Sequence, residues 1–230
     1  MGAAFAYVFA NNGYLSCFDI QSRWMAAAMA EFNINIVLIW AWFVYKESNW
    51  TVAAAIIAST WLVGSITTCG YIFVQFFKLS PEESSTNPLY FVLVKHHKRD
   101  HVRISVVTAR VIVSALGCLM VGVLIYSFIV NASSPYHSNP VARCMVATVI
   151  DIYIHHVVLS VWVAYKEPSF ISAFFWIVLL LCFGSIITCV YIVRQLFYLS
   201  PQHPISLILF SKSDRYLQSN DPLLKAHSDV

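Results

Sequence analysis

The stretches "AWFVYKESNW" (residues 41–50) and "VWVAYKEPSF" (161–170) place one pattern, Trp-x-x-Tyr-Lys-Glu, between long apolar runs at two points of the chain. A shift of 120 residues aligns 23–81 with 143–201 without a gap, and 23 of the 59 aligned positions are identical. Chance similarity between apolar segments would not keep Lys-Glu, Gln and Ser-Pro in register, so the sequence predicts a duplicated unit.

The composition is that of a membrane protein. The chain has 230 residues, is 59% hydrophobic and only 11% charged, and has a mean hydropathy of +0.70, whereas a soluble domain is about 45 to 50% apolar. Its net charge of +3 gives no case for nucleic acid. The long apolar runs predict an all-α, polytopic fold with membrane-spanning helices. We place these helices at about 22–45, 51–78, 103–130, 140–165 and 169–198.

The internal match divides the chain into two units of three helices. We expect repeat one at 1–81, a basic linker at 82–102, repeat two at 103–201 and a polar tail at 202–230. Residues 1–10 align with only the last third of the helix at 103–130, so we expect five full spans and a truncated N-terminal stub; the alternative is a design of five spans. An odd number of spans per repeat predicts two halves of inverted topology.

The linker "KHHKRDHVR" (95–103) sets the expected orientation. It is the densest basic cluster, which favours the cytoplasmic side and contact with anionic lipid headgroups. The sequons at Asn131 and Asn49 then both lie outside, in an endomembrane or the plasma membrane, and the basic tail lies outside with them. The linker cations are Lys95, Lys98, Arg99 and Arg103.

Ionisable residues inside spans are costly and require a partner or a role. Glu31 and Asn35 are four residues apart on one helical face, and the second copy repeats this with Asp151 and His155. Such a pair suits a proton-coupled carboxylate, a metal-ligand cluster or a hydrogen-bonded lock between helices. Alternatively, the acids form structural ion pairs. Arginines that could be their partners are Arg110, which we include in the candidate polar site, and Arg23 and Arg143.

Other patterns have structural interpretations. Gly64-x-x-x-Thr68 and Gly184-x-x-x-Thr188 predict close helix packing, with a helix break at a ligand as the alternative. Adjacent His155 and His156 point about 100° apart on a helix, so they do not favour one metal site, and the six cysteines have neither zinc nor disulfide spacing. We expect no cofactor or metal. The residues expected at the membrane interface are Trp42, Tyr45, Lys46, Glu47, Trp162, Tyr165, Lys166 and Glu167.

The segment 140–201 resembles a family of uncharacterised multi-pass membrane proteins, found mainly in plants and defined by a domain of unknown function. The matching features are Met-x-Ala-Thr-x-x-Asp-x-Tyr (145–153), the Trp-x-x-Tyr-Lys-Glu end, Cys-Phe-Gly-Ser-Ile (182–186), and Gln195 before Leu-Ser-Pro. The first copy departs from the pattern, with Glu31-Phe32-Asn33 in place of Asp-x-Tyr. The resemblance implies an integral membrane protein and no particular activity.

For function, duplication and paired intramembrane acids favour a transporter-like protein for a small solute or ion, coupled to protons. One alternative is a non-catalytic membrane scaffold or biogenesis factor, in which the acids only lock helices together. Another is a membrane-embedded enzyme that acts on lipid, with Asp151 and His155 as acid and base. We favour a protein that is not an enzyme. Nothing in the sequence indicates an oligomeric state.

Overall fold

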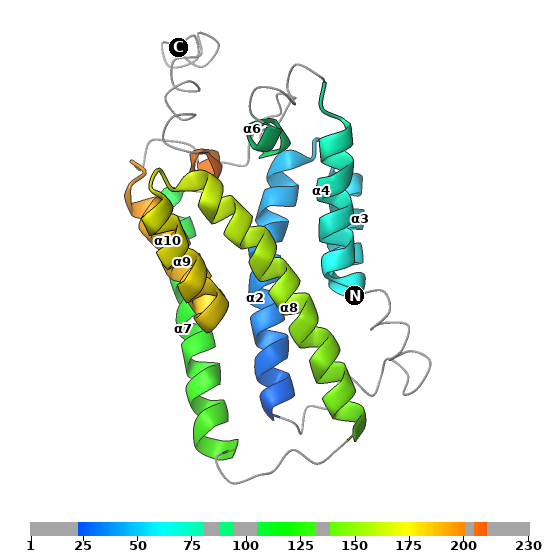
Figure 1. Cartoon of the computed structure of the whole chain (residues 1–230), viewed down its shortest axis with the longest axis vertical. Helices are drawn as coiled ribbons and strands as arrows, with labels where there is room; N and C mark the ends of the chain where they lie inside the picture. The colour runs from blue at the N-terminus through cyan, green and yellow to red at the C-terminus, as the bar shows by residue number, and fades with distance from the viewer. Residues whose placement is uncertain (1–22, 81–87, 94–104, 132–138, 201–204, 211–230) are drawn as a thin grey trace.

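The computed structural model describes residues 23–80, 88–93, 105–131, 139–200 and 205–210, and these residues form helices only. Figure 1 shows the helices as a bundle with most of their axes along one direction. In chain order the elements are α2 (Arg23–Lys46), α3 (Trp50–Val63), α4 (Ser65–Phe77), α6 (Pro88–Leu93), α7 (Val106–Asn131), α8 (Asn139–Lys166), α9 (Phe170–Phe183), α10 (Ser185–Phe197) and the 3-10 helix η2 (Ile205–Leu209).

Three of the described helices are long and apolar enough to cross a membrane. The spans are Trp24–Lys46, Val106–Ile129 and Val146–Lys166, in α2, α7 and α8. At about 1.5 Å per residue, each is long enough for a hydrocarbon core of about 30 Å. In contrast, α3, α4, α9 and α10 have only 13 or 14 residues each, or about 20 Å. The structure thus supports three candidate spans where the sequence predicted five.

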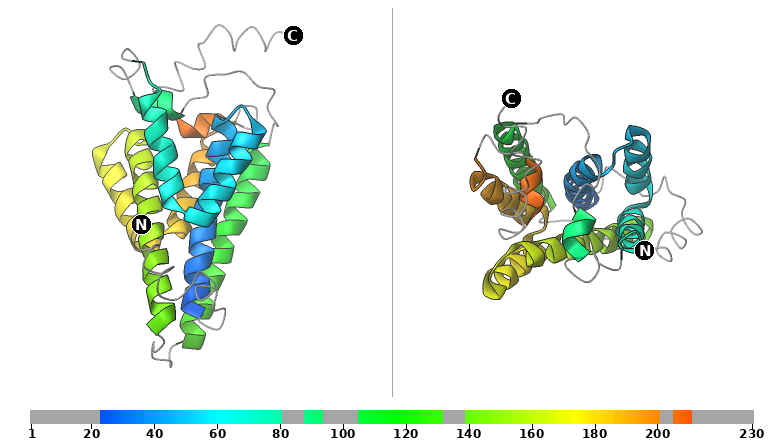
Figure 2. Two further views of the ribbon diagram at one scale, coloured as in Figure 1. Left: turned by 90° about the vertical axis from the view of Figure 1, so that its right-hand side faces the viewer. Right: turned by 90° about the horizontal axis from the view of Figure 1, so that it is seen from above.

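The predicted helices at 51–78 and 169–198 are both broken, at Gly64 and Gly184. Their φ angles are 65° and 59°, in a region that glycine adopts readily and other residues rarely do. The chain reverses at each break. Glu47 and Tyr71 flank α3 on either side and are 24 residues apart, yet Tyr71 Oη lies 2.5 Å from Glu47 Oε1, whereas a continuous helix would separate them by about 36 Å. Each segment is therefore a helical hairpin (Figure 2).

The second hairpin has the same construction as the first. Tyr191 of α10 donates a hydrogen bond of 2.9 Å to Glu167, which precedes α9. The turns of both hairpins lie roughly halfway along α2 and α8 (Figure 1).

A long apolar run predicts a spanning helix and a hairpin of two short helices equally well, because both bury the same kind of residue in lipid.

The two halves run parallel, which corrects the predicted inversion. At the C-terminal end of α2, Lys46 Nζ donates to the carbonyl of Phe91 in α6 at 3.0 Å. At the end of α8, Lys166 Nζ donates to the carbonyl of Phe210 at 3.2 Å. The rings of Tyr90 and Phe210 are 5.4 Å apart, so both helices end at the same end of the bundle (Figure 1). The halves are not inverted because each hairpin returns the chain to the end of the bundle from which it came.

The two sequons begin at Asn49 and Asn131. Asn49 follows α2 and caps the start of α3, where its Oδ1 accepts hydrogen bonds from the backbone N–H and the hydroxyl of Thr51. Asn131 ends α7, which runs from the α6 end of the bundle to the opposite end (Figure 1). The two asparagines therefore lie at opposite ends, not on one side as predicted.

Helix α7 packs between α10 and α2. A buried cluster joins Ile34 of α2, Val113 and Met120 of α7, and Cys189 of α10. Gly117 allows the closest approach, because a Cβ placed there would lie 3.2 Å from the Cβ of Cys189. Small residues at such contacts let helices approach closely in lipid, where van der Waals packing is a main source of association. Close packing at a glycine thus occurs here as well as at the predicted pairs.

Candidate functional site

The carboxylate of Asp151 lies at the turn of the first hairpin. Asp151 is in the middle of α8 and only 3% exposed, and its Oδ1 accepts a 2.8 Å hydrogen bond from the backbone N–H of Ser65. Ser65 is the first residue of α4, so its N–H has no partner within the helix. A carboxylate at this position also interacts favourably with the positive end of the helix dipole. The acid of the second half thus caps a helix of the first half.

Glu31 makes the reciprocal contact at the second hairpin. Its Oε1 accepts a 2.6 Å hydrogen bond from the backbone N–H of Ser185, the first residue of α10. Its Oε2 accepts a second bond, also 2.6 Å long, from the Ser185 hydroxyl. Each half of the chain therefore supplies the acid that holds the hairpin turn of the other half. We call Asp151 with Ser65 and Glu31 with Ser185 the two crossed caps.

The glycines at the breaks are needed for these contacts. A Cβ at Gly64 would collide with the Asp151 carboxylate, and a Cβ at Gly184 would collide with that of Glu31. Glycine therefore serves both the positive φ of the turn and the close approach of the acid. The helix is broken at both positions, and each glycine also allows a close approach; that the break serves a ligand, the alternative interpretation of the Gly-x-x-x-Thr pattern, stays a prediction.

The neighbouring histidines contact different caps. His155 Nε2 lies 3.2 Å from the Thr68 hydroxyl of α4, and its Nδ1 lies 3.0 Å from the Asp151 carbonyl and 3.5 Å from Asp151 Oδ2. His156 instead faces α2, where its Nε2 lies 3.1 Å from Glu31 Oε1 and 3.2 Å from Asn35 Nδ2. The structure therefore groups Asp151 with His155, and Glu31 with Asn35 and His156.

The Nε2 atom of His156 lies close to one hydrogen-bond acceptor and one donor. If Nε2 carries the ring hydrogen, it donates to Glu31 Oε1. If it does not, it accepts from the Asn35 amide, which also lies 3.1 Å from Glu31 Oε1. The tautomer of His156 therefore decides which hydrogen bond it makes.

Three buried polar atoms near the caps have no hydrogen-bond partner among the described residues: Ser65 Oγ, Asn35 Oδ1 and His156 Nδ1. The first has a simple cause. Aspartate is one methylene shorter than glutamate, so Asp151 bonds the Ser65 backbone but not its hydroxyl, whereas Glu31 bonds both groups of Ser185. The two caps are thus equivalent in position but unequal in their hydrogen bonds.

Arg110 lies outside the crossed caps, which corrects its assignment to the polar site. Its guanidinium donates to the carbonyl of Leu196 at 2.8 and 3.2 Å and to that of Leu199 at 2.9 Å. It also stacks over the ring of Phe197. An arginine near the start of α7 meets the end of the antiparallel α10, where helix carbonyls lack partners. The side chains of Arg23 and Arg143 and the basic linker 95–103 lie outside the described residues.

The Trp-x-x-Tyr-Lys-Glu pattern holds the base of each hairpin. Glu47 accepts from Tyr71, and Glu167 accepts from Tyr191, Gln195 and Ser172, with Arg194 at 3.5 Å. The lysines anchor the segments α6 and 208–210 at the same end, and Trp162 Nε1 donates to the Leu209 carbonyl. Their predicted position at an interface remains a prediction. Four further residues of these contacts were not predicted as site residues, although each serine and tyrosine is identical in the two copies: Ser65, Ser185, Tyr71 and Tyr191.

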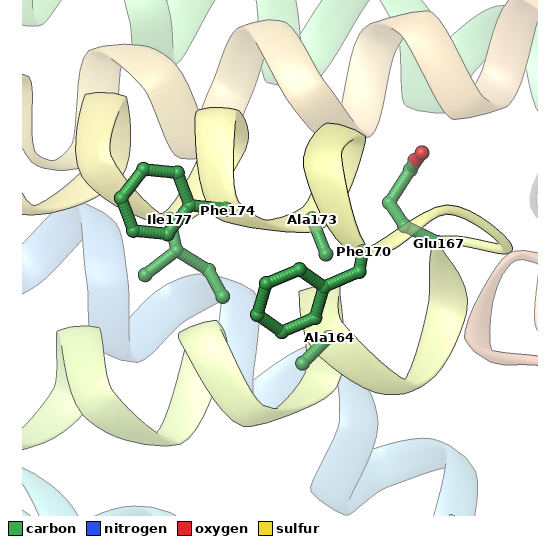
Figure 3. Close-up of a pocket in the computed structure, with 6 residues that line it drawn as sticks. All are labelled: Ala164, Glu167, Phe170, Ala173, Phe174 and Ile177. Carbon is green, nitrogen blue, oxygen red and sulfur yellow. The ribbon is translucent and has the colours of Figure 1, made fainter.

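The described residues contain no group of three or more His, Cys, Asp or Glu side chains that could hold a metal ion. A pocket lies between α8 and α9 and is lined by Ala164, Glu167, Phe170, Ala173, Phe174 and Ile177 (Figure 3). Five of these six residues belong to α9 or the Glu167 turn, and none belongs to a crossed cap.

Fold and site together define an all-helical protein with three candidate membrane-spanning helices and two hairpins tied by the carboxylates of Asp151 and Glu31. The chain belongs to the family described as "Protein of unknown function (DUF1475)", whose model matches residues 1–100 and again residues 98–216. The resemblance to a family defined by a domain of unknown function is thereby confirmed. Neither the curated proteins nor the solved structures include a match to the chain.

Proposed function

We propose that the protein is integral to a membrane, with α2, α7 and α8 crossing the bilayer and the two hairpins entering from one side to about its middle. The lengths of the helices support this, because each hairpin arm is too short to cross. The match of one family model to both parts of the chain supports the duplication. The parallel course of α2 and α8 makes the repeats parallel, related by an axis along the membrane normal.

The distribution of basic residues gives the orientation of this arrangement. The connection between α6 and α7 contains Lys95, Lys98, Arg99 and Arg103, whereas the connection 132–138 contains no Lys or Arg. By the positive-inside rule the α6 end is cytoplasmic. The tail that follows η2 also starts at this end. In this orientation the basic residues of the tail are cytoplasmic, as the positive-inside rule expects. Asn131 is then on the opposite side, where its sequon could be used.

For function we propose transport of a small solute or ion coupled to protons. The observation that carries the proposal is the hydrogen bond between the buried Asp151 carboxylate and Ser65 at the hairpin turn. A charge-assisted bond weakens when the carboxylate takes up a proton, so protonation would loosen the turn. Transporters with internal repeats place their coupling sites near the midplane, at interrupted helices between the repeats.

The test is flux through the full chain in sealed liposomes. An imposed pH gradient is combined with a panel of alkali cations, halides, phosphate, amino acids and sugars, and internal pH is followed with a trapped dye. We expect one solute to collapse the gradient at a rate that falls at least tenfold in Asp151→Asn. The matched control is Val157→Ala, a half-exposed position of the same helix. Equal rates in wild type and Asp151→Asn for the transported solute would contradict coupling.

A second candidate, a non-catalytic scaffold, is favoured by one observation: the described pocket includes no residue of the crossed caps. In that case the acids only hold the two halves together. The flux experiment then gives no solute-dependent flux with the wild type, while Asp151→Asn still lowers the stability of the protein. A lipid-acting enzyme is not proposed, because His155 is fully buried and its Nε2 faces Thr68.

A further inference from the structure

The cap at Asp151 leaves one buried hydrogen-bond donor without a partner. The hydroxyl of Ser65 has no hydrogen-bond partner among the described residues, although Ser65 is only 1% exposed. Ser65 is also the first residue of α4, where backbone N–H groups lack partners within the helix and the helix dipole is positive. Small anions bind at such a helix end. The backbone N–H and the hydroxyl of Ser65 therefore form a pair of donors that suits an anion.

The two carboxylates of the crossed caps differ in how firmly they are held. Glu31 accepts hydrogen bonds from both the backbone N–H and the hydroxyl of Ser185. Asp151 accepts one short hydrogen bond, from the backbone N–H of Ser65, and His155 Nδ1 lies 3.5 Å from its Oδ2. Hydrogen bonds to a carboxylate favour its charged form, so an acid with fewer donors takes up a proton more readily. We therefore expect protonation and release at Asp151 before Glu31.

The helices packed against α8 supply few titratable groups to the surroundings of Asp151. His155 of α8 lies one turn away, and the Cys69 thiol of α4 is close enough to interact with the charge of Asp151. In α2, Glu31 faces the second hairpin together with His156, and α9 contains no charged residue. Among the described residues, Asp151 is thus the carboxylate at the first turn.

The space at this turn limits the size of an anion that could bind there. The backbone of Gly64 lies so close to the Asp151 carboxylate that a single Cβ atom on Gly64 would collide with it. An anion that takes the place of the carboxylate must therefore be about as small, such as a halide, nitrate or formate. Sulfate is larger than a carboxylate and would meet the Gly64 backbone.

We propose that the start of α4 binds a small monovalent anion, the transported solute, which replaces the Asp151 carboxylate when Asp151 takes up a proton. The anion accepts hydrogen bonds from the backbone N–H and the hydroxyl of Ser65. The proton neutralises Asp151 and the anion restores the lost charge, so the turn carries one negative charge in both states. Anion and proton therefore bind together. This inference rests on the proposed proton-coupled transport and names its substrate class.

Binding to the full chain in detergent micelles tests the proposal. Potassium chloride, nitrate, formate or sulfate is added at constant ionic strength, with gluconate as the balancing anion, and the shift of the unfolding temperature gives the dissociation constant. A pH electrode in weakly buffered solution follows proton uptake. We expect one or more of chloride, nitrate and formate, but not sulfate, to stabilise the protein, with one proton taken up per anion. The affinity should fall about tenfold per pH unit where Asp151 is ionised in the free protein.

Three variants identify the groups that take part. Asp151→Asn should bind the anion without proton uptake, because its side chain is already neutral. Asp151→Glu should bind at least tenfold more weakly, because the longer acid reaches the Ser65 hydroxyl. Ser65→Ala should also lose at least about tenfold in affinity, the effect of one hydrogen bond to a charged group. The matched control is Ser160→Ala, which removes another buried hydroxyl without a described partner, outside the crossed caps, and should leave the affinity unchanged.

Several results would overturn the proposal: no salt-specific stabilisation of the wild type, binding without proton uptake, the same uptake in Asp151→Asn, or equal affinities of Ser65→Ala and Ser160→Ala. The flux experiment is a separate test. Coupled flux of a cation or a neutral solute, without anion binding, would support proton coupling and reject the anion. Anion binding with proton uptake but without any flux would reject transport and support the binding site.

Discussion

The backbone N–H of Ser65 lies 2.8 Å from Oδ1 of Asp151, so the turn of the first hairpin is held by the second half of the chain. Glu31 and Ser185 make the reciprocal contact. Each hairpin is also fixed at its base by its own half, through Glu47 and Tyr71 or Glu167 and Tyr191. A hairpin can therefore move at its turn only when the other half releases it.

The glycines at the two turns should be intolerant of any side chain. We expect Gly64→Ala and Gly184→Ala each to lower the free energy of unfolding by more than about 2 kcal/mol, because a positive φ alone costs about 1 to 2 kcal/mol and the new Cβ also displaces a carboxylate. Reversible unfolding in mixed micelles measures this loss.

Gly70 is the matched control for these variants. It lies in the interior of α4, and a Cβ there meets nothing within 4 Å, so Gly70→Ala should be neutral or should stabilise by up to about 1 kcal/mol. If Gly70→Ala destabilised the protein as much as Gly64→Ala, the turn geometry would not be the cause.

Exchanging the two acids should change the stability of the protein in opposite directions, because glutamate is one methylene longer than aspartate. Asp151→Glu supplies the methylene that lets a carboxylate reach Ser65 Oγ, and it should stabilise by about 1 kcal/mol, the net worth of one hydrogen bond. Glu31→Asp loses the bond to the Ser185 hydroxyl and should destabilise by about 1 to 3 kcal/mol, since a buried hydroxyl is left unpaired. Unfolding of both single variants and the double exchange decides this. Destabilisation by both exchanges to the same extent would contradict the unequal caps.

The base contacts should act locally. Glu167 accepts from Tyr191, Gln195 and Ser172, so Glu167→Gln should speed amide exchange in α9 and α10 while α3 and α4 stay protected. Glu47→Gln should do the reverse and with a smaller effect, because Tyr71 is its described hydrogen-bond donor in α4. Hydrogen exchange resolved by peptide measures both. Equal loss of protection in both hairpins, from either variant, would show that the hairpins are not held separately.

Sequence reasoning located most of the helices and the acids. The predicted segments 22–45, 103–130 and 140–165 correspond to α2, α7 and α8 within a few residues, because a run of apolar residues of this length has one main solution in lipid. The pairing of Glu31 with Asn35 and of Asp151 with His155 also follows from helical spacing, since residues i and i+4 share a face.

The hairpins and the crossed caps were not predictable in the same way. The apolar run from 51 to 78 has the length of a span, and only the φ of Gly64 makes it two short helices. That error led to the prediction of three spans per repeat and of an inverted arrangement, whereas α2 and α8 end at the same end of the bundle. Arg110 was assigned by charge, but it bonds carbonyls at the end of α10. The charges in a sequence do not show that an arginine will donate to backbone carbonyls instead of a carboxylate.

The most direct test of the account is the side of the membrane on which each hairpin begins and ends. Single cysteines replace Ser48, before α3, and Lys78, after α4, in a chain without its native cysteines, and a membrane-impermeant maleimide is added to sealed vesicles of known orientation. The hairpin predicts that both positions react from the same side. Reaction of Ser48→Cys and Lys78→Cys from opposite sides would mean that α3 and α4 cross the membrane as one span, and would contradict the account.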